Sequence, residues 1–267
     1  MQGYVRHDTA TGITVHDSGG EGPAFVFQHG LCGDAAQPAA VIPTRYRHIV
    51  MEARGHGHSP LGPQGDITIA TFTADLVAVI EALDTAPCIV GGISMGAAMA
   101  LRLAVTRPDL VRGLVLARPA WVADAAPANL SPNAEVGALL ARHDPETARA
   151  TFLASDTAAR LRAEAPDNLA SLAGFFGRVP QSETATLLSR ISADGPGVTM
   201  DDIARIAVPT LVIATDRDAI HPISLAETLA DTIPQARLTR ITAKSDDPAA
   251  YTRQFRAALA AFLPEVP

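Results

Sequence analysis

The pentapeptide Gly92-Ile93-Ser94-Met95-Gly96 places a serine between two glycines. An apolar run, 86–90, precedes it, and an alanine-rich stretch with helical spacing, 97–105, follows it. Glycine on both sides permits a tight, strained turn from strand to helix, where a larger side chain would collide with its neighbours. Such a turn exposes the Ser94 hydroxyl and leaves the Met95 backbone N–H at a helix N-terminus, where it favours negative charge. The pattern is typical of a nucleophilic serine, and an ordinary glycine turn is the alternative.

Arg118 and Trp121 follow a predicted strand, 113–117, and are candidate substrate contacts. An arginine at the carboxyl end of a core strand suits a substrate carboxylate, because its planar guanidinium binds two oxygens at once. The alternative is an ion pair, for instance with Asp124 or Glu135, that anchors the next segment. Trp121 could equally form a pocket wall or an anchor in the core.

The elements that must position these residues alternate between short apolar runs and longer helical ones. Apolar runs that are hydrophobic throughout are typical of a parallel sheet covered on both faces. Strands are predicted at 24–28, 48–51, 87–91, 113–117, 209–214 and 237–242, and helices at 69–83, 95–106, 223–233 and 249–262. This order predicts an α/β fold with its reactive groups at the carboxyl ends of the strands.

The alternation stops between residues 120 and 200, where no strand is predicted. Helical pieces at 134–141, 145–153, 156–164 and 168–176 suggest a helical cap over the reactive edge, or else a helical domain packed elsewhere. We therefore expect a core of 1–119 and 201–267 with a cap of 120–200. Polar side chains in the cap favour a polar substrate; they are Asn129, Asn133, Arg142, His143 and Asn168.

Composition bounds the partners of this chain. The 267 residues are 48% hydrophobic, which suffices for one large α/β domain with an inserted subdomain. The 28 acidic and 21 basic residues give a net charge of −7, which argues against nucleic acid and anionic membranes. Cys32 and Cys88 are too few for a disulfide framework or a zinc site, and no metal or cofactor motif is present. Residues 1–12 lack the apolar core of a signal peptide. We expect a cytoplasmic protein with a small-molecule partner, and a homodimer is compatible with the sequence.

Taken together, the motifs resemble those of the α/β-hydrolase family along nearly the whole chain. The matching segments are 25–30 with its His-Gly end, the Arg-Gly-His-Gly-His-Ser turn at 54–59, the serine turn at 92–96, the acid-bearing strand and loop at 211–222, and the last helix at 257–263. The resemblance implies a mostly parallel central sheet flanked by helices, with an inserted helical cap.

The resemblance also implies roles for single residues. Ser94 would be the nucleophile, and the backbone N–H groups of Leu31 and Met95 would form the oxyanion hole. Asp218 would be the acid, with Asp216 as an alternative one strand period earlier. His29 opens the His-Gly turn at the pocket and is a further candidate substrate contact.

One departure from the family pattern concerns the base. The family carries a histidine in the loop after its last strand, whereas the corresponding loop here, 243–248, has none, and no histidine follows His221. A serine hydroxyl is a poor nucleophile without a neighbour that takes its proton. Three alternatives stay open, of which we take the first as the candidate base: His221 on the acid loop; His29 or His56; Lys244 or Asp246.

The sequence therefore predicts a serine hydrolase of a small, polar ester, lactone or related carbonyl compound, acting through an acyl-Ser94 intermediate. The alternative from another class is a small-molecule binder, lyase or isomerase on the same fold, because the usual histidine is missing.

Overall fold

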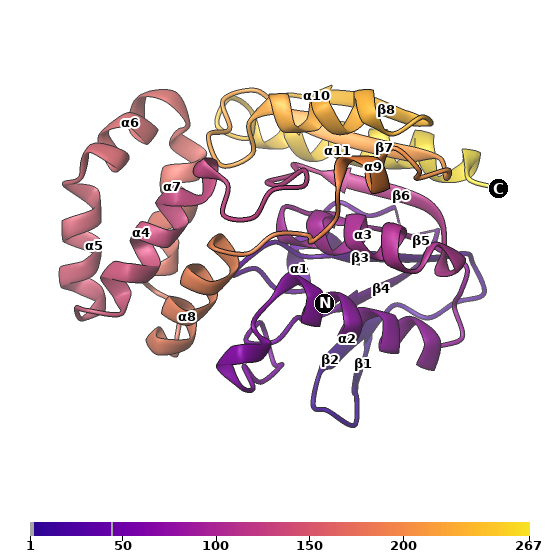
Figure 1. Ribbon diagram of the computed structural model, residues 1–267, viewed down its shortest axis with the longest axis horizontal. Coiled ribbons are helices and arrows are strands. Elements are labelled where there is room, and N and C mark those ends of the chain that lie inside the picture. The colour runs from indigo at the N-terminus through magenta and orange to yellow at the C-terminus, as the bar shows by residue number, and fades with distance from the viewer. Residues whose placement is uncertain (1–2, 44) are drawn as a thin grey trace.

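The computed structural model describes residues 3–43 and 45–267. Within these residues, eight strands form one sheet in the order β1-β2-β4-β3-β5-β6-β7-β8 (Figure 1). β1 and β2 pair antiparallel with their neighbours, and the other strands are parallel. The strands are β1 (Val5–Asp8), β2 (Thr14–Asp17), β3 (Ala24–Gln28), β4 (Arg47–Met51), β5 (Cys88–Ile93), β6 (Val111–Ala117), β7 (Thr210–Thr215) and β8 (Ala236–Ile241).

Helices cover both faces of this sheet, as the apolar strands predict. The flanking helices are α1 (Ala36–Ala39), α2 (Ile69–Ala82), α3 (Met95–Thr106), α10 (Ile223–Thr232) and α11 (Pro248–Phe262). Val90 of β5 belongs to the apolar cluster that holds α2, α3 and α10, whereas its neighbour Ile89 belongs to a second cluster with α11. Successive strand residues point to opposite faces, so these two clusters are the two sides of the core.

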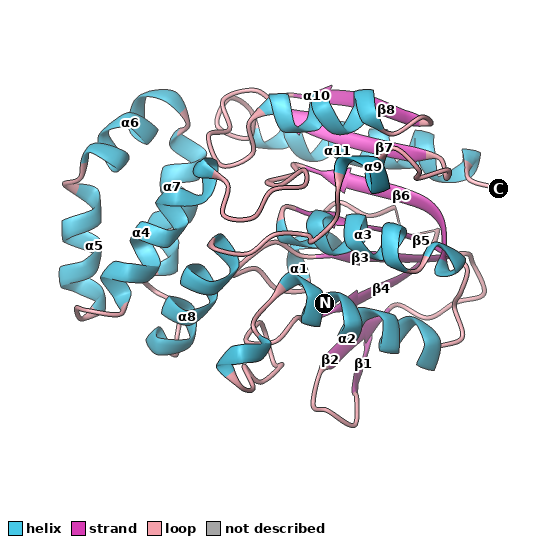
Figure 2. Cartoon of the chain, in the orientation of Figure 1, coloured by secondary structure: helices cyan, strands magenta, loops and turns pink. Residues whose placement is uncertain are grey.

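A second group of helices lies to one side of the sheet (Figure 2). These helices are α4 (Ser131–Leu140), α5 (Pro145–Leu153), α6 (Asp156–Glu164), α7 (Pro166–Phe175) and α8 (Gln181–Ser192). The short helix α9 (Met200–Ile203) lies apart from this group and contacts α3 and α10 (Figure 1). α5 and α6 have the predicted bounds because side chains cap them: Asp144 accepts hydrogen bonds from the backbone of Glu146 and Thr147, and Ser155 accepts one from Ala158. α8 and α9 were not among the predicted helices. The division of the chain at residues 120 and 200 stays a prediction.

The six predicted strands correspond to β3–β8 within two residues at either end. β1 and β2 were not predicted, because both are four residues long and polar, and β1 is exposed along its whole length. In the part of the chain that the structure describes, no helix combines the length and the hydropathy needed to cross a membrane.

Candidate active site

Ser94 occupies a strained turn between β5 and α3. Its backbone has φ 56° and ψ −110°, a left-handed conformation that is costly for a residue with a side chain. The glycines at either end of the pentapeptide allow the close approach that holds this turn. A Cβ atom on Gly92 would lie 2.4 Å from the Gly96 carbonyl carbon, and one on Gly96 would lie 2.6 Å from the Gln28 carbonyl oxygen. The Ser94 N–H donates to the Ala117 carbonyl oxygen at 2.9 Å, so the turn is also tied to β6.

His221 connects Ser94 to Asp218. Its Nε2 lies 2.8 Å from Ser94 Oγ, and its Nδ1 lies 2.8 Å from Asp218 Oδ1. An ionised carboxylate only accepts hydrogen bonds, so the ring proton is on Nδ1 and Nε2 accepts from the serine hydroxyl. Both side chains of the pair are shielded, with 9% of the His221 and 3% of the Asp218 side chain exposed. A hydrogen-bonded chain from Ser94 through His221 to Asp218 is thus assembled from the turn after β5 and one loop after β7.

The Asp218 carboxylate is held both by Arg118 at the end of β6 and by Asn168 of α7. Arg118 donates from Nε and Nη2 to Asp218 Oδ2, each at 2.7 Å. Asn168 of α7 donates from Nδ2 to Asp218 Oδ1 at 2.9 Å, and its own carbonyl accepts from the Ala219 N–H at 2.7 Å. The His221 N–H also donates to Asp218 Oδ1, at 3.1 Å. These contacts fix both the carboxylate and the loop that carries it.

The pKa values of the pair follow from this environment. Burial alone would raise the pKa of Asp218, but the charges of His221 and Arg118 and their hydrogen bonds outweigh it and hold that pKa well below its usual range. Burial lowers the pKa of His221, and the Asp218 charge only partly opposes this shift. At neutral pH the carboxylate is therefore ionised and the imidazole neutral, which is the form that accepts a proton.

The two backbone amides expected at the oxyanion hole lie at this site. Leu31 and Ser94 line the same cavity, and Met95 follows Ser94 as the first residue of α3. Among the described residues, neither the Leu31 nor the Met95 N–H makes a backbone or side-chain hydrogen bond. The neighbouring turn is fixed instead by the Gly30 N–H, which donates to Gln37 Oε1 at 2.7 Å, and the Cys32 N–H, which donates to His56 Nε2 at 2.9 Å.

Two of the alternative bases, His29 and His56, are committed to the backbone. His29 Nδ1 donates to the Gly30 carbonyl oxygen at 2.9 Å, while Nε2 accepts from the Ala53 N–H at 3.1 Å. His56 Nδ1 donates to the Arg54 carbonyl oxygen at 2.9 Å, and its Nε2 accepts from Cys32 as above. Burial lowers the pKa of both rings. Both ring nitrogens of each histidine are occupied, so these side chains hold the turns around the pocket through hydrogen bonds to the backbone.

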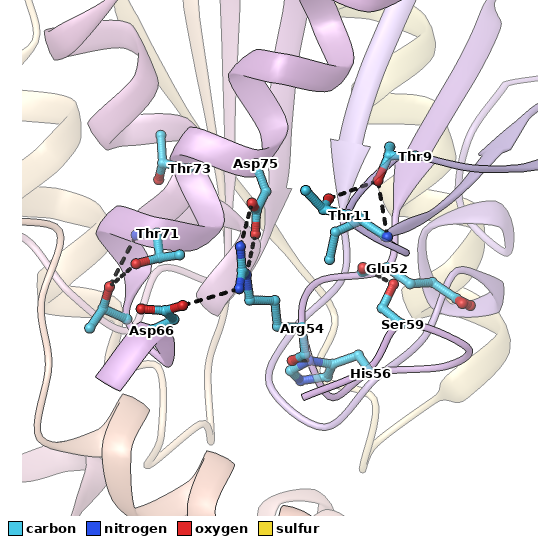
Figure 3. A network of polar contacts seen from close by, with 12 residues as sticks. Thr9, Thr11, Glu52, Arg54, His56, Ser59, Asp66, Thr71, Thr73 and Asp75 are labelled. Carbon is cyan, nitrogen blue, oxygen red and sulfur yellow. Dashed lines mark hydrogen bonds and ion pairs between the residues drawn. The ribbon is translucent and has the colours of Figure 1, made fainter. Parts of the chain in front are cut away.

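Arg54, at the start of the loop that contains His56, holds this loop in place through ion pairs. Figure 3 shows the Arg54 side chain reaching Asp75 on one side and Asp66 on another. Arg54 Nε lies 2.7 Å from Asp75 Oδ2, and Nη1 lies 3.4 Å from Asp66 Oδ2. The Arg-Gly-His-Gly-His-Ser motif thus has a structural role: Arg54 fixes its loop, and His56 holds the turn next to Leu31.

The remaining candidates lie away from Ser94. Lys244 Nζ is 3.6 Å from Asp167 Oδ1, and Asp246 Oδ1 accepts from Arg217 Nη1 at 2.6 Å. Asp216 is exposed. None of Lys244, Asp246 and Asp216 lines the cavity beside Ser94.

A cavity of about 340 Å³ opens beside the Ser94 hydroxyl. Its polar lining includes Ser94, Arg118 and His221, together with Asn133, Asn168 and Arg178 from the segment that spans α4 to α8. Arg118 lies in this lining as predicted, but its ion pairs are with Asp218 and, at 3.9 Å, Asp167, rather than with Asp124 or Glu135.

Two predicted substrate contacts, His29 and Trp121, are corrected by the structure. Neither lines the cavity. His29 is 1% exposed and holds the turn described above. Trp121 is 2% exposed and donates from its indole nitrogen to the Asp194 carbonyl oxygen at 2.9 Å, so it anchors the segment that leaves β6. Arg178, in the turn before α8, was not predicted, because no motif surrounds it.

A further group of metal-ligand side chains lies outside this cavity. His16 Nε2 and His58 Nδ1 are each 3.1 Å from a carboxylate oxygen of Glu52, and these three potential ligands lie within 4.8 Å of one another. This group was not predicted from the sequence, because its members come from β2, the residue after β4 and the following loop.

Comparison with known proteins identifies relatives of this chain. A family model described as "alpha/beta hydrolase fold" matches residues 23–244. The pimeloyl-[acyl-carrier protein] methyl ester esterase of Chromobacterium violaceum is 31% identical over 254 residues, which span 91% of this chain and 95% of the esterase.

Two further likenesses are more limited in what they show. The sn-1-specific diacylglycerol lipase ABHD11 of Mus musculus is 36% identical over 124 residues, but the match spans only 45% of this chain and 38% of the lipase. The solved structure of the enol-lactonase from Burkholderia xenovorans LB400 superposes with a TM-score of 0.71 at 24% identity, covering 97% of this chain and 100% of the other, and so shares the fold.

Proposed function

Because this chain belongs to the α/β-hydrolase fold family, we propose that it is a serine hydrolase that cleaves small esters, lactones or related carbonyl compounds through Ser94. The observation that carries the proposal is the 2.8 Å contact between His221 Nε2 and Ser94 Oγ, backed by the equally short contact to Asp218. The esterase likeness supports an ester as substrate. The same contact removes the reason for preferring a non-hydrolytic binder, lyase or isomerase, which was the lack of a base.

In the first half-reaction, His221 takes the hydroxyl proton as Ser94 Oγ attacks the substrate carbonyl. The carbonyl oxygen becomes an oxyanion, which the Leu31 and Met95 N–H groups stabilise. Each such donor contributes about 3 kcal/mol in enzymes of this chemistry. As the tetrahedral intermediate collapses, the bond to the alcohol breaks and His221 returns its proton to that leaving group.

In the second half-reaction, a water molecule attacks the acyl-Ser94 carbonyl and gives a proton to His221. The bond between Ser94 Oγ and the acyl carbon breaks, and His221 protonates the departing serine. Asp218 stays ionised throughout and stabilises the imidazolium that forms twice in each cycle. Helices α4–α8 act as the cap that limits water in the cavity.

A fluorophosphonate probe tests the proposal. The probe phosphonylates activated serines, so we expect it to modify Ser94, as peptide mass spectrometry would show. A 4-nitrophenyl acetate assay should show turnover in the same preparation. The Ser94→Ala variant is the control and should lose both signals. A wild-type protein that is folded but neither labels at Ser94 nor hydrolyses short esters would refute the proposed function.

The pH dependence of activity follows from the lowered pKa of His221. The imidazole must be neutral to accept the serine proton, so activity falls when His221 becomes protonated at low pH. Because burial lowers this pKa from its ordinary value of 6.5, kcat/KM for an uncharged ester should rise with pH along a limb whose midpoint lies below 6.5, and be level from about pH 7 to about pH 8. Initial rates across this range measure the midpoint. A midpoint above 7 would contradict the burial argument.

A further inference from the structure

The two arginines that line the cavity differ in how their charges are balanced. The Arg118 guanidinium is bound by the Asp218 carboxylate at 2.7 Å and lies 3.9 Å from Asp167. Arg178 has no carboxylate within 4.0 Å among the described residues. Its contacts are two long hydrogen bonds, from Nη2 to the Gly55 carbonyl oxygen and from Nη1 to Thr184 Oγ1, both at 3.4 Å. Arg178 therefore carries a positive charge that the protein does not neutralise locally.

Arg178 lies next to the turn that carries the oxyanion amide. Burial raises the pKa of the Cys32 thiol to about 11, and the nearby Arg178 guanidinium only partly opposes this shift. Cys32 directly follows Leu31, and all three residues line the cavity with Ser94. A half-buried cation at this position attracts an anion more strongly than one in water, because the surroundings screen the charge less.

Asn133 of α4 adds a polar wall to the same cavity. It is 6% exposed, and its Oδ1 is buried without a hydrogen-bond partner among the described residues. An apolar substituent packed against this amide would leave the buried carbonyl unsatisfied, which disfavours its binding. At Asn133, the cavity therefore favours a polar substituent that can donate a hydrogen bond to this oxygen.

We propose that Arg178 is a specificity residue that binds a carboxylate on the substrate while the ester or lactone carbonyl lies at Ser94. The preferred substrates are then small carboxylate-bearing esters or lactones, and Arg118, whose charge Asp218 neutralises, is not the anchor. The inference rests on the proposed function of Ser94. A guanidinium that forms two parallel hydrogen bonds to a carboxylate supplies both affinity and orientation.

Matched esters test this specificity. Monomethyl succinate, glutarate and adipate carry a carboxylate at increasing distance from the ester, and each has an uncharged counterpart with an isopropyl group in place of the carboxylate. We expect kcat/KM for the best monomethyl ester to exceed that of its counterpart by at least about 10-fold. The isopropyl group of the counterpart cannot accept a hydrogen bond, so the Arg178 guanidinium stays unpaired when it binds. Arg178→Met should lower kcat/KM for the charged ester by about 10- to 100-fold and that for the counterpart by less than about 3-fold.

The controls separate charge from folding. Arg178→Lys keeps the charge and should retain part of the preference. Arg190→Met removes an exposed arginine of α8 outside this cavity and should leave both rates unchanged. Equal losses on both esters in Arg178→Met, or a wild type without preference for the charged series, would overturn the inference.

Binding distinguishes failure of this inference from failure of the proposed function. Calorimetry of the preferred monomethyl ester with Ser94→Ala requires no turnover, and adding Arg178→Met to that variant should weaken binding by about 10-fold or more. Unchanged binding would overturn the role of Arg178 even if the probe labels Ser94. Conversely, wild-type protein that fails to label, yet binds the ester through Arg178, would refute hydrolysis and keep the anion site.

Discussion

Replacing His221 with alanine should lower kcat for ester hydrolysis by about 10⁴- to 10⁶-fold. His221 is the imidazole that contacts Ser94 Oγ, and both rings of the alternative pair, His29 and His56, already hold backbone groups. Among the described residues, no other side chain is therefore placed to take the serine proton once the ring is gone. Steady-state rates on 4-nitrophenyl acetate measure the loss, and fluorophosphonate labelling of Ser94 should slow in parallel.

The matched control for His221 is His143, an exposed histidine after α4. His143→Ala should keep wild-type kcat, which shows that loss of a histidine as such is harmless. If His221→Ala retained activity within about 10-fold of wild type, a different group would have to be the base. The assignment of the base to the acid loop would then be wrong.

The second large effect is expected for Asp218→Asn, with kcat about 10⁴-fold lower. An amide of the same shape no longer holds the ring proton on His221 Nδ1, so the nitrogen that faces Ser94 is not reliably the acceptor. The same change leaves the Arg118 guanidinium, 13% exposed, without its main partner. Breaking a buried pair in this way costs about 3–5 kcal/mol of folding stability. Chemical denaturation and kinetics together measure both effects.

Asp216 offers the matched control, because it lies two residues earlier on the same loop and is exposed. Asp216→Asn should change kcat by less than about 3-fold and leave stability within about 0.5 kcal/mol. A large loss in Asp216→Asn with an active Asp218→Asn would reverse the choice between the two acids.

The serine turn and the sheet could be predicted because their causes are local. The glycines at 92 and 96 are required by contacts under 3 Å, and apolar strands buried on both faces leave a clear pattern in the sequence. β1 and β2 were missed because both are short and polar: β1 is an exposed edge strand, and β2 is buried although its sequence carries no apolar run. The sequence favoured His221 as the base but left the other candidates open, since the choice depends on where the loop after β7 meets Ser94.

The residues around the cavity show the limit of sequence reasoning more clearly. Trp121 and His29 have the chemistry of pocket residues, but packing places one in the core and uses both nitrogens of the other. Arg178 belongs to no recognisable sequence motif. Its proposed role depends on the absence of a carboxylate beside it among the described residues, which only the three-dimensional structure reveals. Arg118 was correctly predicted at the carboxyl end of a core strand, but its ion-pair partner, Asp218, lies 100 residues away in the chain.

Acid and base sit three residues apart on one loop, so they move as a single unit. A shift of residues 218–221 would carry Asp218 and His221 together and preserve the hydrogen bond between them, while changing the separation of His221 from Ser94. Arg118 at the end of β6 and Asn168 of α7 both donate hydrogen bonds to the Asp218 carboxylate on this loop. The distance between the His221 imidazole and the Ser94 hydroxyl therefore depends on where Arg118 and Asn168 hold this loop.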